Sequence, residues 1–265
     1  MKNHRKKRYK VISGISLIMF FVIWQIYAML NAKMGWMNKA FLPAPTEVLV
    51  TFKKFFDEGT LFVHIGVSLL RIVKGFLIGS VIGVIVGYIM AKLQVFESIL
   101  QPVINILGAI PPYAFMPLLI IWFGVGEFAK IIMIVLATFI PVLASTIQGV
   151  KSINPLHIRS AKTLGCNEFQ LFYHVIVKTA APFIIAGMKT SISLCFSALV
   201  VAEMIGSDTG LGFIIVDGRN WFKVANMFMA MTSIALLQTL FQGILTMLER
   251  KLFKWKREGL ASAIE

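Results

Sequence analysis

Residues 75–91 read GFLIGSVIGVIVGYIMA, an uninterrupted stretch without a charged side chain. Glycine recurs every four residues along it, at Gly75, Gly79, Gly83 and Gly87. Because an α-helix has about 3.6 residues per turn, these positions share one face. A helix of about 20 mainly apolar residues crosses a bilayer, and residues 64–74 can extend this one. Glycines on one face let a neighbouring backbone approach, so the stretch predicts a membrane helix packed inside a bundle or at a subunit interface.

The whole chain has the composition of an integral membrane protein. Of its 265 residues, 58% are hydrophobic and 14% are charged, and the mean hydropathy is +0.82. A soluble domain carries about 25% charged residues. The formal net charge of +14 comes from basic residues in short clusters between apolar runs, a pattern that more often sets membrane orientation than binds a polyanion. The composition therefore excludes disordered, nucleic-acid-binding and ordinary cytosolic proteins.

Six apolar runs are long enough to be membrane helices. They are residues 11–30, 75–91 with its extension, 98–126, 131–150, 180–202 and 224–248. The first run follows a basic cluster, but it is longer than the about 7–15 apolar residues of a secretory signal, so we expect it to remain as a helix. The predicted fold class is an all-α integral membrane protein with six transmembrane helices.

The distribution of lysine and arginine predicts the orientation. With the N-terminus inside, the cytoplasmic segments are residues 1–10, 92–97, 149–179 and 249–265. These segments hold 16 basic residues, against seven in the opposite loops. Because positive residues resist translocation, both termini are predicted to be cytoplasmic. In the first outer loop, residues 47–58 form an amphipathic stretch that we expect to lie along the membrane surface, with Thr46 as its N-cap.

Proline interrupts the third run and must bend or break it, at Pro102, Pro111, Pro112 and Pro117. Proline donates no backbone hydrogen bond and clashes with the preceding turn. The carbonyl groups left unpaired at membrane depth need protein or a water-filled cavity. Two interpretations stay open: a broken helix beside a translocation path, and a purely structural kink. The candidate path residues are Pro111, Pro112, Tyr113 and Glu203.

The segment between the fourth and fifth runs, residues 149–179, has the signals of a small structure of its own. Asn154 is a good N-cap, and Pro155 suits the first helical position. Gly165 can end that helix in the left-handed conformation, and Asn167 then caps a second helix. A loop of about 30 residues that forms its own structure is usually functional. We expect its first helix to expose two small side chains for close contact with another protein, Ser160 and Ala161.

In this segment the chain resembles the permease subunits of binding-protein-dependent ABC importers, and most closely the nitrate, sulfonate and taurine group. The family's EAA loop has Glu-Ala-Ala, three residues and then Gly, and here Arg159-Ser160-Ala161 is followed after three residues by Gly165. Further matching stretches, in the family's order, are residues 42–45, 117–127 and 201–206. Two positions depart from the pattern. Arg159 replaces the usual acidic residue, and Lys178 stands where a proline often precedes the fifth span.

The resemblance implies an ABC transmembrane type-1 bundle in residues 59–248, preceded by residues 1–58 and followed by a basic tail, residues 249–265. It also implies two permease chains as a homodimer, two copies of a separate ATPase subunit, and an extracytoplasmic solute-binding protein. The sequence has no Gly-x-x-x-x-Gly-Lys-Ser/Thr loop, so we expect no ATP binding, enzyme activity, cofactor or metal in this chain. The implied ATPase-coupling residues are Arg159, Ser160, Ala161, Leu164, Gly165 and Phe169, with Phe169 packing the loop.

Two other classes of function fit less well. An ion-driven transporter keeps ionisable groups near the bilayer centre, whereas the charged residues of the apolar runs can lie near span ends, at Arg71, Lys74, Lys189 and Glu203. Glu203 is the best candidate for a proton relay, although a satisfied carboxylate at the membrane boundary is the simpler interpretation. A membrane enzyme needs clustered nucleophiles, bases or metal ligands, and the four histidines are scattered. The solute stays open among sulfonates, taurine, nitrate, a thiamine pyrimidine precursor and riboflavin.

Overall fold

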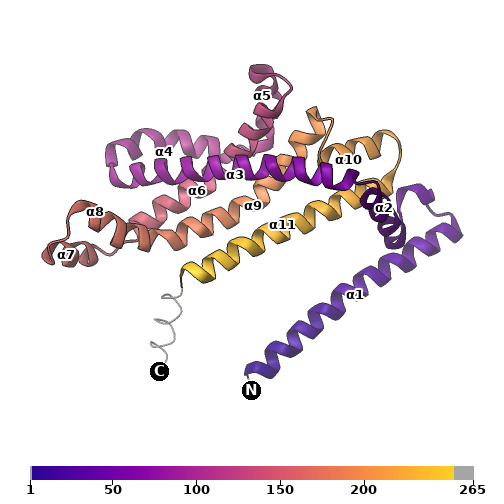
Figure 1. The fold of residues 1–265 in the computed structure, drawn as a ribbon, viewed down its shortest axis with the longest axis horizontal. Coiled ribbons are helices and arrows are strands. Elements are labelled where there is room, and N and C mark those ends of the chain that lie inside the picture. The colour runs from indigo at the N-terminus through magenta and orange to yellow at the C-terminus, as the bar shows by residue number, and fades with distance from the viewer. Residues whose placement is uncertain (1, 254–265) are drawn as a thin grey trace.

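The computed structural model describes residues 2–253, and the described part of the chain is helical, with no strand. Five of its helices are long and apolar enough to cross a membrane, and the number is six if a pair of helices joined by a sharp bend is counted as one span. The predicted all-α fold with six spans is therefore confirmed. In Figure 1 most of the long helices run along the long axis, with α7 (Pro155–Thr163) and α8 (Glu168–Leu171) at one end and α2 (Pro45–Asp57) and α10 (Leu211–Asn220) at the other.

The long helices are α1 (Lys2–Met34), α3 (Thr60–Lys92), α6 (Glu127–Lys151), α9 (Lys178–Gly206) and α11 (Val224–Leu252). The bent pair consists of α4 (Gln94–Ala109), a 3-10 turn η2 (Pro112–Phe115) and α5 (Met116–Phe123). The shorter elements are η1 (Lys39–Phe41), α2 (Pro45–Asp57), α7 (Pro155–Thr163), α8 (Glu168–Leu171), the π-helical segment η3 (Phe172–Val177) and α10 (Leu211–Asn220).

The third span is broken where the sequence predicts, but only at one pair of prolines. Its two arms meet at 91° on either side of Pro111 and Pro112. Pro102 lies inside α4, and Pro117 lies in the first turn of α5, where a missing N–H group leaves no hydrogen bond unmade. Two consecutive residues without a backbone donor are therefore what ends the helix.

The predicted glycine face of α3 packs against α6. A methyl group added at Gly75 would lie 2.6 Å from the side chain of Ile134, and one at Gly79 would lie 2.7 Å from the carbonyl oxygen of Val135. Methyl groups at the other two glycines of the face would lie 3.0 Å and 2.9 Å from atoms of the same helix. Because no side chain fits at these distances, the glycines bring the two backbones together, as expected for helices that associate within a membrane.

Helix α6 is held on its other side by α9 in the same way. A methyl group at Gly187 of α9 would lie 2.6 Å from the side chain of Ser145, and one at Gly149 of α6 would lie 2.8 Å from that of Phe183. Between the three helices lies the main buried cluster, which includes Ile72, Phe76, Met133, Ala137, Phe196 and Leu199. Helices α3, α6 and α9 thus form one closely packed unit, called here the central unit.

Helix α1 runs apart from the central unit (Figure 1). Near its C-terminal end the ring of Trp24 lies 5.3 Å from that of Phe228 in α11, and Gln25 accepts a hydrogen bond from the backbone N–H of Thr46 at 3.3 Å. Most of the described apolar side chains of α1 remain exposed, as suits a helix that faces lipid or another subunit.

One local prediction was wrong, and two features of the fold were not predicted. Helix α2 begins at Pro45 with Ala44 as its N-cap residue, so Thr46 is not the cap. Instead, the carboxylate of Glu47 accepts the backbone N–H of Ala44 at 3.3 Å. The second helix of the cytoplasmic loop is not separate, because α8 and η3 continue without a break into α9. Finally, α10 was not predicted: it is too short to be a span, and it is stabilised by burying Leu211 and Ile214 in a cluster with side chains of α2, α3 and α11.

Candidate functional site

The loop that carries the family-like motif has the local structure predicted for it. The side chain of Asn154 accepts the backbone N–H of Leu156 at 2.9 Å and so caps α7. Gly165 has a φ of +79°, the left-handed conformation that lets the chain turn after α7. Asn167 and Gln170 then exchange hydrogen bonds between side chain and backbone, at 2.8 and 3.0 Å, and start α8. Capping residues and one glycine therefore define this loop.

Some side chains of the loop that were predicted to be exposed are buried, and the reverse. Ala161 is 8% exposed and packs inward, so it is not available to a partner in the way expected. Phe169 was expected to pack the loop, but it is 76% exposed; Leu171 is buried instead. The reason is the helical period: Leu171 lies two positions further along α8, on the face turned toward the chain. Ser160 is exposed, as predicted.

An ion pair holds the two helices of the loop together, and a ring contact and a continuous helix join the loop to the spans. Lys162 of α7 binds the carboxylate of Glu168 of α8 at 2.9 Å. The ring of Phe172 in η3 meets that of Tyr88 in α3 edge to face, with centroids 4.9 Å apart. Because α8, η3 and α9 form one helical run, the loop is joined to the central unit by continuous helical backbone. The π-helical segment lies between the loop and the span, and such segments often mark functional sites.

A cavity of about 670 Å³ lies beside the break in the third span. It is lined by all three residues of the predicted path that flank the break, Pro111, Pro112 and Tyr113, together with apolar side chains that include Phe115, Trp122 and Phe139. A second hollow of about 480 Å³ adjoins it at Gly108 and Ile140. Gln101 and Asn105, hydrogen-bonded to each other at 2.8 Å, line that second hollow. Of the two interpretations of the break, the geometry favours a break beside a cavity.

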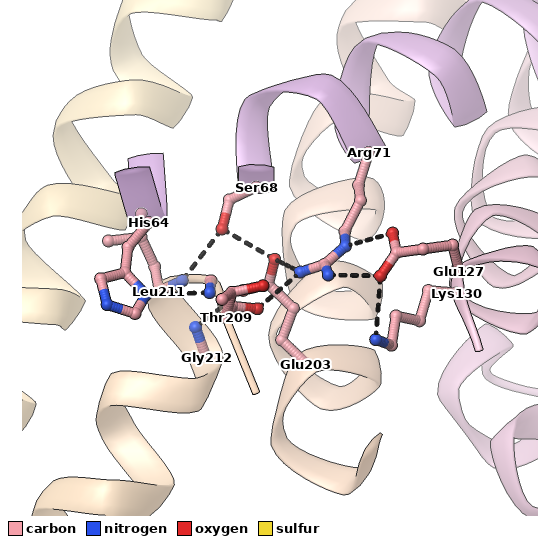
Figure 2. Close-up of polar contacts among 10 residues, drawn as sticks. His64, Ser68, Arg71, Glu127, Lys130, Glu203, Thr209, Leu211 and Gly212 are labelled. Carbon is pink, nitrogen blue, oxygen red and sulfur yellow. Dashed lines mark hydrogen bonds and ion pairs between the residues drawn. The ribbon is translucent and has the colours of Figure 1, made fainter. Parts of the chain in front are cut away.

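Glu203, the fourth residue of the predicted path, does not line this cavity. It belongs to a group of charged side chains centred on Arg71, whose guanidinium donates to Glu203 at 2.8 Å and to Glu127 at 2.7 Å (Figure 2). Arg71 also donates to the carbonyl oxygen of Thr209 at 2.8 Å, and Lys130 binds Glu127 at 3.1 Å. The side chain of Arg71 is 4% exposed and that of Glu203 is fully buried. Two positive and two negative charges thus balance where α3, α6 and α9 lie together.

The carboxylate of Glu203 also holds the turn that leads into α10. It accepts hydrogen bonds from the hydroxyl of Ser68 at 2.7 Å and from the backbone N–H of Gly212 at 2.8 Å (Figure 2). The backbone N–H of Gly210 donates to Nδ1 of His64 at 3.0 Å. A side chain at either glycine would collide with Glu203. Glu203 therefore has its hydrogen bonds satisfied within the chain, which is the simpler of the two interpretations given for it.

Sequence reasoning identified the charged residues Arg71 and Glu203 but not their pairing, and it did not single out Glu127 or Lys130. The available signal was that all four are charged residues at the edges of apolar runs, where a charge needs a partner of opposite sign. Among the described residues, no group of three or more His, Cys, Asp or Glu side chains is placed to hold a metal ion. Lys189 is bound to Glu249 at 2.8 Å, whereas Lys74 is exposed.

Several known proteins resemble this chain in sequence or in fold. A family model described as the binding-protein-dependent transport system inner membrane component matches residues 79–254. The putative aliphatic sulfonates transport permease protein SsuC of Bacillus subtilis is 32% identical over 96% of this chain and 91% of its own length. The taurine transport system permease protein TauC of Escherichia coli is 33% identical over 92% of this chain and 89% of its own length. A chain from the crystal structure of an amino acid ABC transporter superposes with a TM-score of 0.61 at 15% identity, over 76% of this chain and 98% of that one.

Proposed function

This chain belongs to the family of binding-protein-dependent transport system inner membrane components and is a permease subunit of an ABC importer; from this premise we propose how it works and what it carries. Two copies of the chain form the translocation path, two ATPase subunits bind them from the cytoplasm, and an extracytoplasmic binding protein delivers the solute. The observation that carries the proposal is the capped α7–glycine–α8 loop, which lies inside the region matched by the family model.

The loop of residues 149–179 couples ATP hydrolysis to the spans. Closure of the ATPase pair pushes on α7, and the resulting displacement is transmitted to the spans through the continuous helical run α8–η3–α9. The glycine contacts support movement of the central unit as one body, because interhelical distances this short leave no room for sliding past side chains. The residues assigned to this coupling are Arg159, Ser160, Leu164, Gly165 and Phe169. Ala161 supports them from the inner side of α7.

The path for the solute follows the cavity at the broken span. Pro111, Pro112 and Tyr113 line it, and its mostly apolar wall suits the organic part of a small solute. The relatives SsuC and TauC are described as permeases for aliphatic sulfonates and for taurine. We assign this chain to the same solute class, that of small organic sulfonates.

The chain lies in a bacterial inner membrane with both termini in the cytoplasm. The excess of lysine and arginine in the segments around α7 and at both ends supports this orientation. The family-like bundle then occupies residues 59–248. The segment of residues 1–58 adds α1 and α2, and the basic tail of residues 249–265 begins in the last turn of α11.

Transport in a reconstituted system tests the function. The full chain is co-expressed with the ATPase and binding-protein genes of its own locus and placed in proteoliposomes with ATP in the lumen. Radiolabelled taurine and ethanesulfonate are supplied outside with the binding protein. We expect uptake that needs both ATP and the binding protein and that persists when ionophores collapse ion gradients.

Two results would contradict parts of the proposal. Uptake that follows an ion gradient without ATP would contradict the importer function and would restore the ion-coupled alternative, for which the bound state of Glu203 gives no support. ATP-driven uptake of nitrate or riboflavin, with no uptake of either sulfonate, would contradict the solute class while leaving the importer function in place.

A further inference from the structure

The exposed face of α7 has one cation that the rest of the described chain leaves unpaired. Leu156, Arg159, Ser160 and Thr163 follow one another at helical spacing of three and four residues, so they share a face. All four are exposed, while Ala161 on the other side is buried. Arg159 lies in the middle of this face. Leu164, which follows the helix, is 83% exposed.

The described acidic residues on the same side of the bundle already form ion pairs with lysines. In the described parts of the segments predicted to face the cytoplasm, the carboxylates are Glu97, Glu168 and Glu249. Each is bound to a lysine: Glu97 to Lys151, Glu168 to Lys162 and Glu249 to Lys189. Arg159 has no ion pair within the described residues, and its side chain is exposed to solvent.

A partner that covers α7 takes the Arg159 side chain out of solvent. Moving an unpaired guanidinium out of water is costly unless a carboxylate and its hydrogen bonds take the place of the lost solvation. Arginine suits such a bond, because its planar group donates two parallel hydrogen bonds to one carboxylate. The exposed apolar side chains beside it, Leu156 and Leu164, need an apolar surface at the same time.

Building on the proposed function, we propose that the ATPase partner receives α7 on an apolar surface that has a carboxylate placed to bind Arg159. The permease chain has a basic residue where the family resemblance leads one to expect an acidic one, and the partner has the matching acid. Charge at this contact therefore selects the cognate ATPase among the ATPases of related importers.

Binding of the ATPase that co-purifies with the unaltered full-length chain tests the proposal. We expect Arg159→Glu to weaken binding by about tenfold or more, because it sets two carboxylates against each other, and Arg159→Lys to weaken it far less. Lys162→Glu is the matched control: it makes the same change of charge on the same helix, at a side chain already bound within the chain. Its effect should stay within about threefold.

A rescue experiment locates the carboxylate. Surface Asp and Glu residues of the ATPase are changed one at a time to Arg and tested against the Arg159→Glu permease. We expect one of these changes to restore binding to Arg159→Glu and to weaken binding to the unaltered chain. Binding of Arg159→Glu within about twofold of the unaltered chain would overturn the proposal, and so would a loss that no acid-to-Arg change rescues. Failure of the unaltered chain to capture any ATPase would instead count against the proposed function itself.

Discussion

The two ends of the bundle are held together by opposite means. At one end, called here the network end, Arg71 and Glu203 are buried and bound by each other and by Glu127, Ser68 and Gly212. At the other, the loop end, α7 is held by an asparagine cap, one glycine turn and one surface ion pair. The Arg71–Glu203 pair is buried inside the protein at the network end, whereas the charged side chains of the loop end are exposed to solvent.

The difference follows from what each kind of interaction contributes. Removing one member of a buried ion pair leaves a buried charge without a partner and costs about 3–5 kcal/mol. An exposed pair contributes only about 0–1 kcal/mol. The network end is therefore expected to stay in one arrangement, while the loop end can change its contacts when a partner binds. A transporter that is pushed at one end and must move as a body needs both properties.

Loss of the central arginine should have the largest effect on folding. Arg71→Met leaves the buried carboxylate of Glu203 without its cation, and we expect a loss of about 3–5 kcal/mol in the stability of the folded chain. Lys74→Met, three residues along the same helix and at an exposed position, should have little effect. Thermal unfolding in detergent, followed by size-exclusion fluorescence, measures both. Equal melting temperatures for the two variants would contradict the role given to the network end.

Placing a side chain between α3 and α6 should have the second-largest effect on stability. Gly79→Val places two methyl groups against the backbone of Val135, and overpacking of this kind costs about 1–3 kcal/mol. The control is Gly66→Val on the same helix, where no atom lies within 4 Å of an added methyl group. The same unfolding assay compares them. If Gly66→Val proves as damaging as Gly79→Val, the helix itself rather than its contact with α6 is sensitive.

At the loop end, Gly165→Val should impair transport more than folding. Gly165 has a positive φ but open space around it, so valine meets only backbone strain, about 1–2 kcal/mol and confined to the turn. We expect normal membrane insertion and loss of ATP-driven uptake. Gly165→Asn, which tolerates the left-handed conformation, should keep most of the uptake. Normal uptake by a well-expressed Gly165→Val variant would remove this glycine from the coupling loop.

The smallest effect is expected from the cap of α7. Asn154→Ala removes the acceptor for the backbone N–H of Leu156, which costs about 0.5–2 kcal/mol of local helix stability. Asn154→Asp retains an acceptor and should behave like the unaltered chain. Hydrogen exchange of the α7 amides measures the change. Faster exchange in α7 alone is expected, and faster exchange throughout α9 would show that the two ends are not independent.

Much of this architecture follows from local patterns in the sequence. The glycine spacing of residues 75–87 predicted a packed face because the helical repeat alone places all four glycines on one side of the helix. The sequence also predicted the caps Asn154 and Asn167 and the turn at Gly165, because each of these features depends only on residues within four positions of it. Even the break at Pro111 and Pro112 is local, because it depends on which residues lack an N–H group.

What escaped prediction depends on contacts between distant segments. Arg71 and Glu203 lie 132 residues apart in the sequence, and no neighbouring residue in the sequence indicates which residue either of them pairs with. The short helix α10 exists because tertiary burial of Leu211 stabilises it, and helix propensity alone is a weak guide to such an element. The exposure of Phe169 likewise depends on which face of α8 the remainder of the chain covers.

The most direct test of the account is to purify the tagged full-length chain from its native membranes in mild detergent and to identify what accompanies it. The account predicts an ATPase subunit at equal stoichiometry and ATP hydrolysis by the purified preparation, with hydrolysis no longer coupled to transport after Gly165→Val. A chain that purifies alone and moves solute in response to an ion gradient would contradict the account.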